Sequence, residues 1–332
     1  MLEVRRFHIN ARVGVILAVI FALAIALLPS MVSAKTANTI KVSPVRNDIV
    51  INAGESKEVP ITITNLTSDP ITVQVSQNDF VAGDERGTPA LILDENKYAK
   101  THSLKRFMEP LPNITIPGNG AKTIKAKINV PSSAQAGGYF GAVRLSPASP
   151  DSGGQVNMAP SVATLILLTV PGDMVEKLDL TNFGIQQKGK PSNGFFLTPD
   201  DLQATVRFES DGNVQLGPFG KLSVLQGDDV VYEADFNEKA PRDMILPNSA
   251  RQWEVPLKNV GSFGHYTVKA TFTYGQTNQT VEVEKSFWVV PMWAIIAAGV
   301  FLIVLAVVIF LVVRRIRNRP HLSSRHYGYR RR

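Results

Sequence analysis

Apolar residues recur at every second position over most of the chain between residues 40 and 290. The runs Val59–Ile63, Ile71–Val75 and Ile124–Val130 alternate apolar with polar residues, and β-branched residues dominate them. Gly, Pro, Asn and Asp separate the runs, as in the polar turn over residues 65–70. A period of two with such turns is typical of β-strands that bury one face. The pattern therefore predicts sheets that pack face to face.

The second half of the chain repeats this alternation, and we expect its strands over 202–208, 220–225, 230–234, 253–257, 266–274 and 281–290. Residues 162–170 are apolar without alternation, which predicts a strand buried on both faces. Pro171-Gly172-Asp173 ends that run and marks the expected domain boundary, with the Pro/Ser/Gly-rich stretch 147–154 as an alternative. We expect an all-β ectodomain of two tandem immunoglobulin-like β-sandwiches, over residues 35–170 and 171–290.

The alternation lapses between Phe80 and Asn113, an insertion that is long for a loop in a sandwich. Residues 95–108 are weakly helical in pattern and gather cations and rings: Lys97, Tyr98, Lys100, His102, Lys105, Arg106 and Phe107. One interpretation is a binding surface for an anionic or sugar-rich cell-wall polymer, with cations on anionic groups and rings on sugar faces. The other is a solvated helix face that covers the sandwich, with Tyr98 and Leu104 packed beneath it.

The run Gly137–Leu145 begins with closely spaced glycines, which permit close backbone approach or a bulge at the start of a strand. Tyr139 and Phe140 must point to opposite faces of this strand, so only one of them belongs in the core. The other, with Tyr139 as the candidate, lies at a contact surface or under the insertion.

The first 34 residues are typical of a secretory signal peptide. A basic stretch ends at Arg12, an uncharged apolar stretch runs from Val13 to Leu28, and Pro29 follows. Small residues at Val32-Ser33-Ala34 predict cleavage between Ala34 and Lys35. An uncleaved N-terminal anchor is the alternative.

Residues 291–313 carry no charge and predict a transmembrane helix. At 1.5 Å per residue this stretch spans about 34 Å, enough for the hydrocarbon core of a bilayer. Trp288 and Trp293 stand at one end, where indole rings favour the headgroup layer, and Arg314 and Arg315 stand at the other. By the positive-inside rule the protein crosses the plasma membrane once, with an extracellular N-terminus and a cytoplasmic tail over 314–332.

The helix itself is the expected anchor, since no sortase motif precedes it. The nearest candidate, Leu246-Pro247-Asn248-Ser249-Ala250, lies too far upstream and lacks the closing glycine.

The charge distribution reflects membrane topology. The net charge is +7 and the pI about 9.5, but eight arginines and no acid follow residue 313, and the ectodomain is close to neutral. A phosphate-binding face is therefore not indicated, and no nucleic-acid partner is expected. The absence of cysteine favours a bacterial or archaeal exported protein over a eukaryotic ectodomain, which usually carries disulfides.

No catalytic or metal-binding motif is present. Only His102 and His265 lie between residues 35 and 313, and neither has a partner at a recognisable catalytic or ligand spacing. The acidic pairs 84–85, 94–95, 200–201 and 228–229 are interpreted as solvated turns, with calcium sites as the alternative. We expect no enzyme activity, no metal and no cofactor.

Several segments give the chain a resemblance to the WxL-interacting proteins of Gram-positive bacteria. They are Ile40–Pro44, Asn65-Leu66-Thr67, Ile128–Pro131, Gly137–Val143, Gly212-Asn213-Val214, Leu246-Pro247, Gly264–Val268 and Thr273–Gly275, followed by the single apolar span and its basic tail. The resemblance implies a first domain that binds peptidoglycan and a second that binds WxL-type surface proteins.

Together these features predict a non-enzymatic cell-surface protein that tethers cell-wall polymer, another surface protein or both to the membrane. Its expected partners are peptidoglycan, a WxL-type protein and membrane lipid. The alternatives are a structural spacer of an envelope assembly and a non-catalytic subunit of an envelope enzyme.

Overall fold

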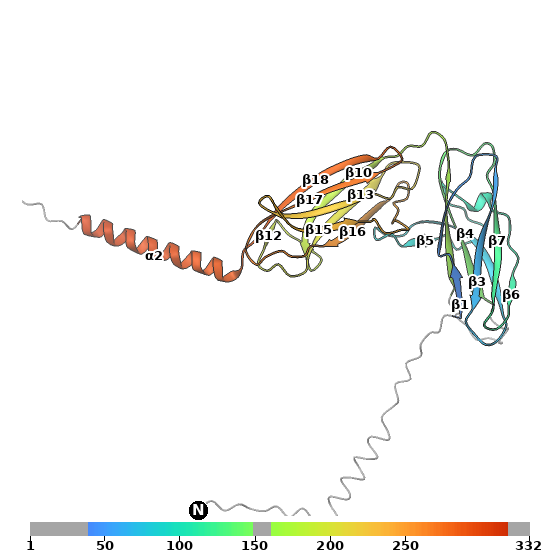
Figure 1. The fold of residues 1–332 in the computed structure, drawn as a ribbon, viewed down its shortest axis with the longest axis horizontal. Helices are drawn as coiled ribbons and strands as arrows, with labels where there is room; N and C mark the ends of the chain where they lie inside the picture. The colour runs from blue at the N-terminus through green and yellow to red at the C-terminus, as the bar shows by residue number, and fades with distance from the viewer. Residues whose placement is uncertain (1–38, 149–160, 318–332) are drawn as a thin grey trace, which may run out of the picture. The chain divides into compact units, whose positions relative to one another are not determined.

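The computed structural model describes residues 39–148 and 161–317 (Figure 1). The predicted signal peptide, its cleavage site at Ala34 and Lys35, and residues 318–332 of the tail lie outside this range. The expected fold class is confirmed, because the described strands form four sheets in two immunoglobulin-like sandwiches, and one long apolar helix follows them.

In the first sandwich a sheet of order β1-β3-β7 faces a sheet of order β2-β9-β8-β4-β5, and β6 also pairs with β4. The chain changes sheets early, since β1 pairs antiparallel with β3 and β2 pairs parallel with β9. The strands are β1 (Ile40–Ser43), β2 (Arg46–Val50), β3 (Ser56–Asn65), β4 (Ile71–Ala82), β5 (Pro89–Leu91), β6 (Ile114–Ile116), β7 (Ala121–Asn129), β8 (Gly137–Pro147) and β9 (Val162–Val170).

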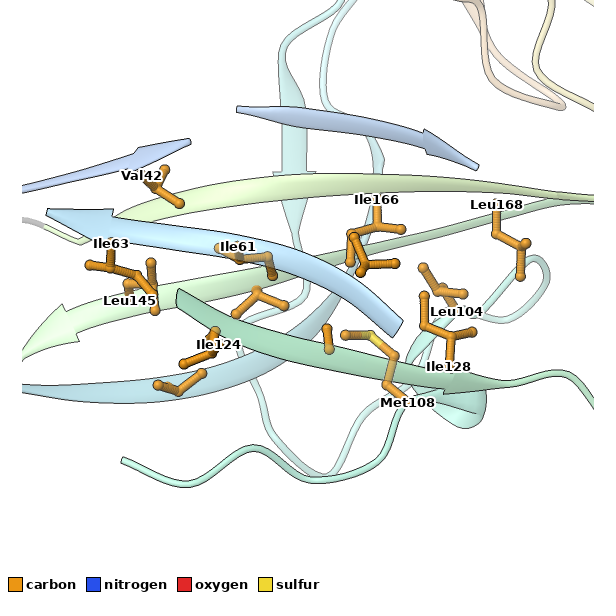
Figure 2. Close-up of a cluster of buried hydrophobic side chains, with 14 of the residues drawn as sticks. Val42, Ile61, Ile63, Leu104, Met108, Ile124, Ile128, Leu145, Ile166 and Leu168 are labelled. Carbon is orange, nitrogen blue, oxygen red and sulfur yellow. The ribbon is translucent and has the colours of Figure 1, made fainter. Parts of the chain in front are cut away.

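The core of the first sandwich is aliphatic. The alternating residues of β3 and β7, such as Ile61, Ile63 and Ile128, point inward and meet Leu145 of β8 and Ile166 of β9 (Figure 2). All five are fully buried. The apolar residues that recur at every second position in the sequence therefore form the face of each strand that this sandwich buries.

In the second sandwich a sheet of order β11-β10-β13-β16 faces a sheet of order β12-β18-β17-β14-β15. Its core contains many rings, with Phe272 in edge-to-face contact with Phe183, Phe208 and Phe236. The strands are β10 (Leu178–Gln187), β11 (Lys190–Pro191), β12 (Phe195–Phe196), β13 (Leu202–Ser210), β14 (Phe219–Gln226), β15 (Asp229–Phe236), β16 (Ala250–Pro256), β17 (Gly264–Tyr274) and β18 (Gln279–Val289).

The strands expected from alternation are all present, and the apolar run 162–170 is the strand β9 inside its sheet. The helix expected over residues 95–108 is wrong. Only the single 3₁₀ turn η1 (Lys105–Phe107) forms there. His102 has a left-handed backbone with φ of 59°, and the amide of Phe140 donates to its carbonyl, so the segment is bound to β8 and does not close helical bonds on itself.

The two sandwiches contact each other through polar and apolar groups. Arg207 donates two hydrogen bonds to the carboxylate of Glu85, at 2.8 and 2.9 Å, which lower the pKa of that carboxyl group. The amide of Gly138 donates to the carbonyl of Asn213 at 2.8 Å. Gly137, with φ of 141°, would place a Cβ only 2.6 Å from the same oxygen, so this contact requires the glycine. The expected close backbone approach in this glycine run is therefore present.

The helix α2 (Met292–Arg317) follows β18 after two residues. It is long and apolar enough to cross a membrane by length and composition, and Arg314, Arg315 and Arg317 lie in its last turn.

Candidate binding surface

A buried carboxylate attaches the insertion to the first sandwich. Asp79 of β4 is completely buried and accepts three hydrogen bonds from the insertion. The donors are the amide of Ala99 at 2.9 Å, the hydroxyl of Ser103 at 2.6 Å and the amide of Lys105 at 2.8 Å. Three donors on one carboxylate compensate its loss of water. Asp79 thus fixes both ends of the segment 99–105.

Apolar packing completes the attachment. Leu104 is fully buried in the core of the first sandwich, where Figure 2 shows it near Ile128 and Leu168. It also lies against Gly141 of β8, where a Cβ would stand 3.0 Å from the Cβ of Leu104. This close approach lets the insertion lie directly on β8.

Two cations lie over the ring of Tyr98. The Nζ of Lys105 is 4.9 Å and the Cζ of Arg106 is 4.4 Å from the ring centroid. The Tyr98 side chain is 44% exposed, so this cluster is at the surface. Such contacts hold the cations in place, which lowers the entropy lost when an anion binds. The ring is partly covered by these cations, which leaves less of its face open to another group.

Lys97 and Lys100 extend this cluster. Both are exposed, and Lys97 pairs with Asp94 at 3.3 Å. Within the described residues, no acceptor lies at hydrogen-bond distance from the charged groups of Lys100 or Arg106. We name Lys97, Tyr98, Lys100, Lys105 and Arg106 the basic surface.

The turn η1 joins the basic surface to a second aromatic group. Phe107, next to Arg106, packs on Tyr139 with 4.8 Å between ring centroids. Tyr139 donates to the carbonyl of Gln135 at 2.9 Å, and partial burial raises its pKa. The two neighbouring rings point to opposite faces of β8, as expected, but the expectation that Tyr139 is the one outside the core is wrong: Tyr139 is partly buried against the core of the first sandwich, whereas Phe140, 3% exposed, lies on the outer face of the sheet. His102 reaches Gly138, where its Nδ1 is 2.6 Å from the carbonyl oxygen.

The predicted membrane-interface residues lie on both sides of the apolar span. Trp288 is on β18 and is 44% exposed, Trp293 is in the first turn of α2, and Arg314 and Arg315 are in its last turn. The tryptophans thus lie at or just before the start of the helix and the arginines at its end. The structure describes no membrane around them.

No arrangement for catalysis is evident in the described parts of the chain. His102 is bound to the backbone carbonyl of Gly138 and His265 packs on the ring of Trp288 at 4.7 Å, and neither is hydrogen-bonded to a hydroxyl or carboxylate of the described residues. A pocket where the sandwiches meet is lined by apolar side chains with Arg46, Asp84 and Arg251, and it contains no histidine. Across residues 39–148 and 161–317 no group of three His, Cys, Asp or Glu side chains is placed to hold a metal ion.

Sequence reasoning missed Asp79, although a signal was present. Asp79 has the same parity as Val73 and Val75 on β4, so the alternation places a carboxylate on a core position. A buried acid requires donors, and the adjacent insertion is the segment that can supply them.

The comparisons with known proteins bear on the first sandwich most directly. Residues 37–146 match the family model described as WxL Interacting Protein, peptidoglycan binding domain. The resemblance to WxL-interacting proteins is confirmed over this segment. The matched segment contains the whole insertion, the basic surface and Tyr139. A peptidoglycan-binding domain family and one apolar C-terminal helix fit a cell-surface protein, and they favour a binding protein over an enzyme.

Solved structures with a similar fold include several chaperones. The E. coli chaperone DraB is 13% identical, with a TM-score of 0.34 over 75% of this chain and 96% of that one. The Pseudomonas aeruginosa chaperone CupB2 is 10% identical, with a TM-score of 0.33 over 74% and 99%. The class 5 fimbriae chaperone CfaA is 12% identical, with a TM-score of 0.38 over 75% and 98%. Likenesses of this size carry no function to this chain. No curated protein matches the chain in sequence.

Proposed function

We propose that this protein binds cell-wall peptidoglycan through the basic surface of its first sandwich while α2 anchors it in the plasma membrane. The second sandwich then binds another surface protein, which the family resemblance implies is of the WxL type. The match of residues 37–146 to a peptidoglycan-binding domain is the observation that carries this proposal.

The chemistry of the basic surface supports it. Peptidoglycan offers carboxylates on its stem peptides, and these favour Lys and Arg partners. Arg106 is well suited because its planar guanidinium binds a carboxylate through two N–H groups, and Tyr98 and the turn η1 hold it in place. Ligand binding here would need little rearrangement of the chain, since Asp79 and Leu104 already fix the backbone.

Sedimentation of the full chain in detergent with purified peptidoglycan tests the proposal. The test variant replaces Lys97, Lys100 and Arg106 by Glu, and we expect it to lose binding at least about tenfold at low salt, less at high salt. The matched control replaces Lys41, Lys57 and Lys122 by Glu, which are exposed lysines on the β1-β3-β7 sheet of the same sandwich. It makes the same number of charge reversals and should bind like the parent chain.

The results separate the alternatives. Equal binding by parent, test and control chains discards the basic surface as the site. No binding by any of them favours the structural spacer, in which the sandwiches only separate partners that others bind.

The role of Tyr98 sharpens this test. Tyr98→Phe keeps an aromatic ring under both cations and should retain binding. Tyr98→Ala removes the ring, and we expect a loss of about two- to fivefold, in line with an exposed cation–π contact. Equal loss in both variants would mean that the hydroxyl itself contacts the ligand.

A further inference from the structure

The exposed apolar side chains of the second sandwich are concentrated at one end. Among its described residues six large apolar side chains are strongly exposed, and five of them lie at strand ends or loops next to the last residues of β18: Phe195, Leu197, Val230, Phe263 and Trp288. The sixth, Val175, lies before β10, at the opposite end.

Strand register, and the position of Leu197 directly after β12, place the five at the same end. In the pairing of β12 with β18, Phe195 is the partner of Trp288, and in that of β17 with β18, His265 is the partner of the same residue. Phe263 directly precedes β17, and Val230 is opposite Leu225 at the turn between β14 and β15. We name Phe195, Leu197, Val230, Phe263 and Trp288 the apolar rim.

The chain itself brings this rim close to the membrane span. β18 ends at Val289 and α2 begins at Met292. Three residues of extended chain reach about 10 Å at most, and the headgroup layer of a bilayer is about 5–7 Å thick on each side. The rim residues lie on, or directly next to, strands within three spacings of β18, each about 4.8 Å. If α2 is in the membrane, the end of the second sandwich that contains Val289 therefore lies close to the lipid surface, at any tilt of α2.

The composition of the rim fits that location. Phe and Trp rings favour the boundary between headgroups and acyl chains. The neighbouring loops are mixed in charge, with Lys188, Lys190 and Lys258 against Asp200, Asp201, Asp228 and Asp229. Because the charges nearly cancel, lipid charge has little to attract, and burial of apolar surface is the driving force.

We propose that the apolar rim docks into the headgroup layer of the same membrane that holds α2, so that the second sandwich is attached to the lipid surface at several points. This inference rests on the anchoring by α2 proposed above. It adds a lipid-contacting surface on a folded domain, formed by residues up to 97 positions before the first residue of α2. Such docking restrains the swing of the ectodomain about Pro291.

The absence of cysteine permits a site-specific test in the full chain. Single-cysteine variants at Asn193 and Ser262 place an environment-sensitive fluorophore beside Phe195 and Phe263 without replacing them. Asp173→Cys, an exposed position beside Val175, is the matched control at the far end, and Val304→Cys labels α2 itself. Each labelled chain is reconstituted in vesicles of uncharged phosphatidylcholine, with and without bromine on the acyl chains.

We expect bromine to quench the labels at 193 and 262 at least about twofold more than the label at 173, and the label at 304 most strongly. Replacing Phe195 and Phe263 by Ser in the Ser262→Cys chain should reduce its quenching to near the level at 173. This last comparison separates docking from mere proximity to α2.

Three results would overturn the proposal. Labels at 193 and 262 that behave like the label at 173 exclude contact with lipid. Quenching that survives the two serine replacements shows that the short connection alone keeps the end near the membrane. A blue shift without quenching shows that the rim is covered by protein, such as a second copy. An unquenched label at 304 is distinct from these, because it rejects the anchor and the docking together.

Discussion

The first sandwich buries aliphatic side chains between its sheets, whereas the second buries five Phe and two Tyr rings. Among the described residues of the first sandwich no ring is fully buried between the sheets, although Phe107 and Tyr139 are partly buried against its core. Phe80 and Phe140 are on the outer face of its larger sheet, with Met244 and Leu246 of the second sandwich, and Tyr98 and Phe107 are in the insertion. The comparison teaches that similar β-alternation serves two purposes. Where the structure describes it, the first sandwich has no ring among the fully buried residues of its core, whereas the second sandwich depends on buried rings for its stability.

The second core should therefore be the more sensitive to loss of a ring. Phe272→Ala removes a fully buried side chain that contacts three other rings, and we expect a loss of about 3–5 kcal/mol in the free energy of unfolding. The three tryptophans are at 253, 288 and 293, and Trp253 packs on Phe236. Tryptophan fluorescence during urea unfolding thus reports this sandwich without a signal from the first.

A matched control uses a ring on the surface. Phe195 is 67% exposed, and Phe195→Ala in detergent should change the same transition by less than about 1 kcal/mol. If the two alanine variants unfolded at similar urea concentrations, the aromatic core would not be the source of stability in this domain.

In the first sandwich the largest effect outside the core should come from a polar residue. Asp79→Ala leaves the amides of Ala99 and Lys105 and the hydroxyl of Ser103 without their acceptor, and we expect a loss of about 2–3 kcal/mol. Hydrogen exchange should rise in residues 92–108, and the tryptophan transition of the second sandwich should stay where it is.

Asp94→Ala is the control for this change. Asp94 is exposed and accepts from the amide of Asn96, so its removal should affect stability by less than about 1 kcal/mol. Equal exchange in both variants would show that the insertion is held by Leu104 and its apolar contacts alone.

Alternation was sufficient to predict the fold class and most strands, because a buried face imposes its period on the sequence. The insertion was the exception. Its conformation depends on residues distant in sequence, such as Asp79 and Gly141. The local pattern of apolar and polar residues does not predict such contacts. The helical pattern over 95–108 was overruled for that reason. Short pairings such as β12 with β18 are also too brief to leave a period.

The candidate ligand-binding residues were predicted as one group, and the structure divides them into the basic surface and a second group around Tyr139. Sequence proximity identified the basic surface, but the cation–π contacts of Tyr98 and the packing of Phe107 on Tyr139 depend on the turn η1. The apolar rim was not foreseen beyond Trp288. Its members come from four separate segments, and only the strand register brings them to one end.

The smallest expected difference between the sandwiches is in how their stability changes as the pH is lowered. Glu109, near the end of the insertion, accepts from Lys127 at 2.7 Å and from Asn129 at 2.8 Å, both near the end of β7, and these bonds lower its pKa below the ordinary value of 4.5. A carboxyl group with a depressed pKa in the folded state stabilises the fold above the unfolded-state value, and this contribution is lost as the pH falls through the folded-state value. The contribution is thus present at pH 7 and fades below about pH 4.5.

Urea unfolding read by circular dichroism measures this, once the transition of the second sandwich has been assigned by its tryptophan fluorescence and the remaining transition is taken for the first. The parent chain should exceed Glu109→Gln slightly at pH 7, and the two midpoints should converge near pH 3. Glu282→Gln on β18 of the second sandwich is the control, an exposed carboxylate with no ion pair among the described residues, and its midpoint should follow the parent at both values. A difference between parent and Glu109→Gln that persists at pH 3 would mean that the Glu109 side chain stabilises the first sandwich through its shape and not its charge.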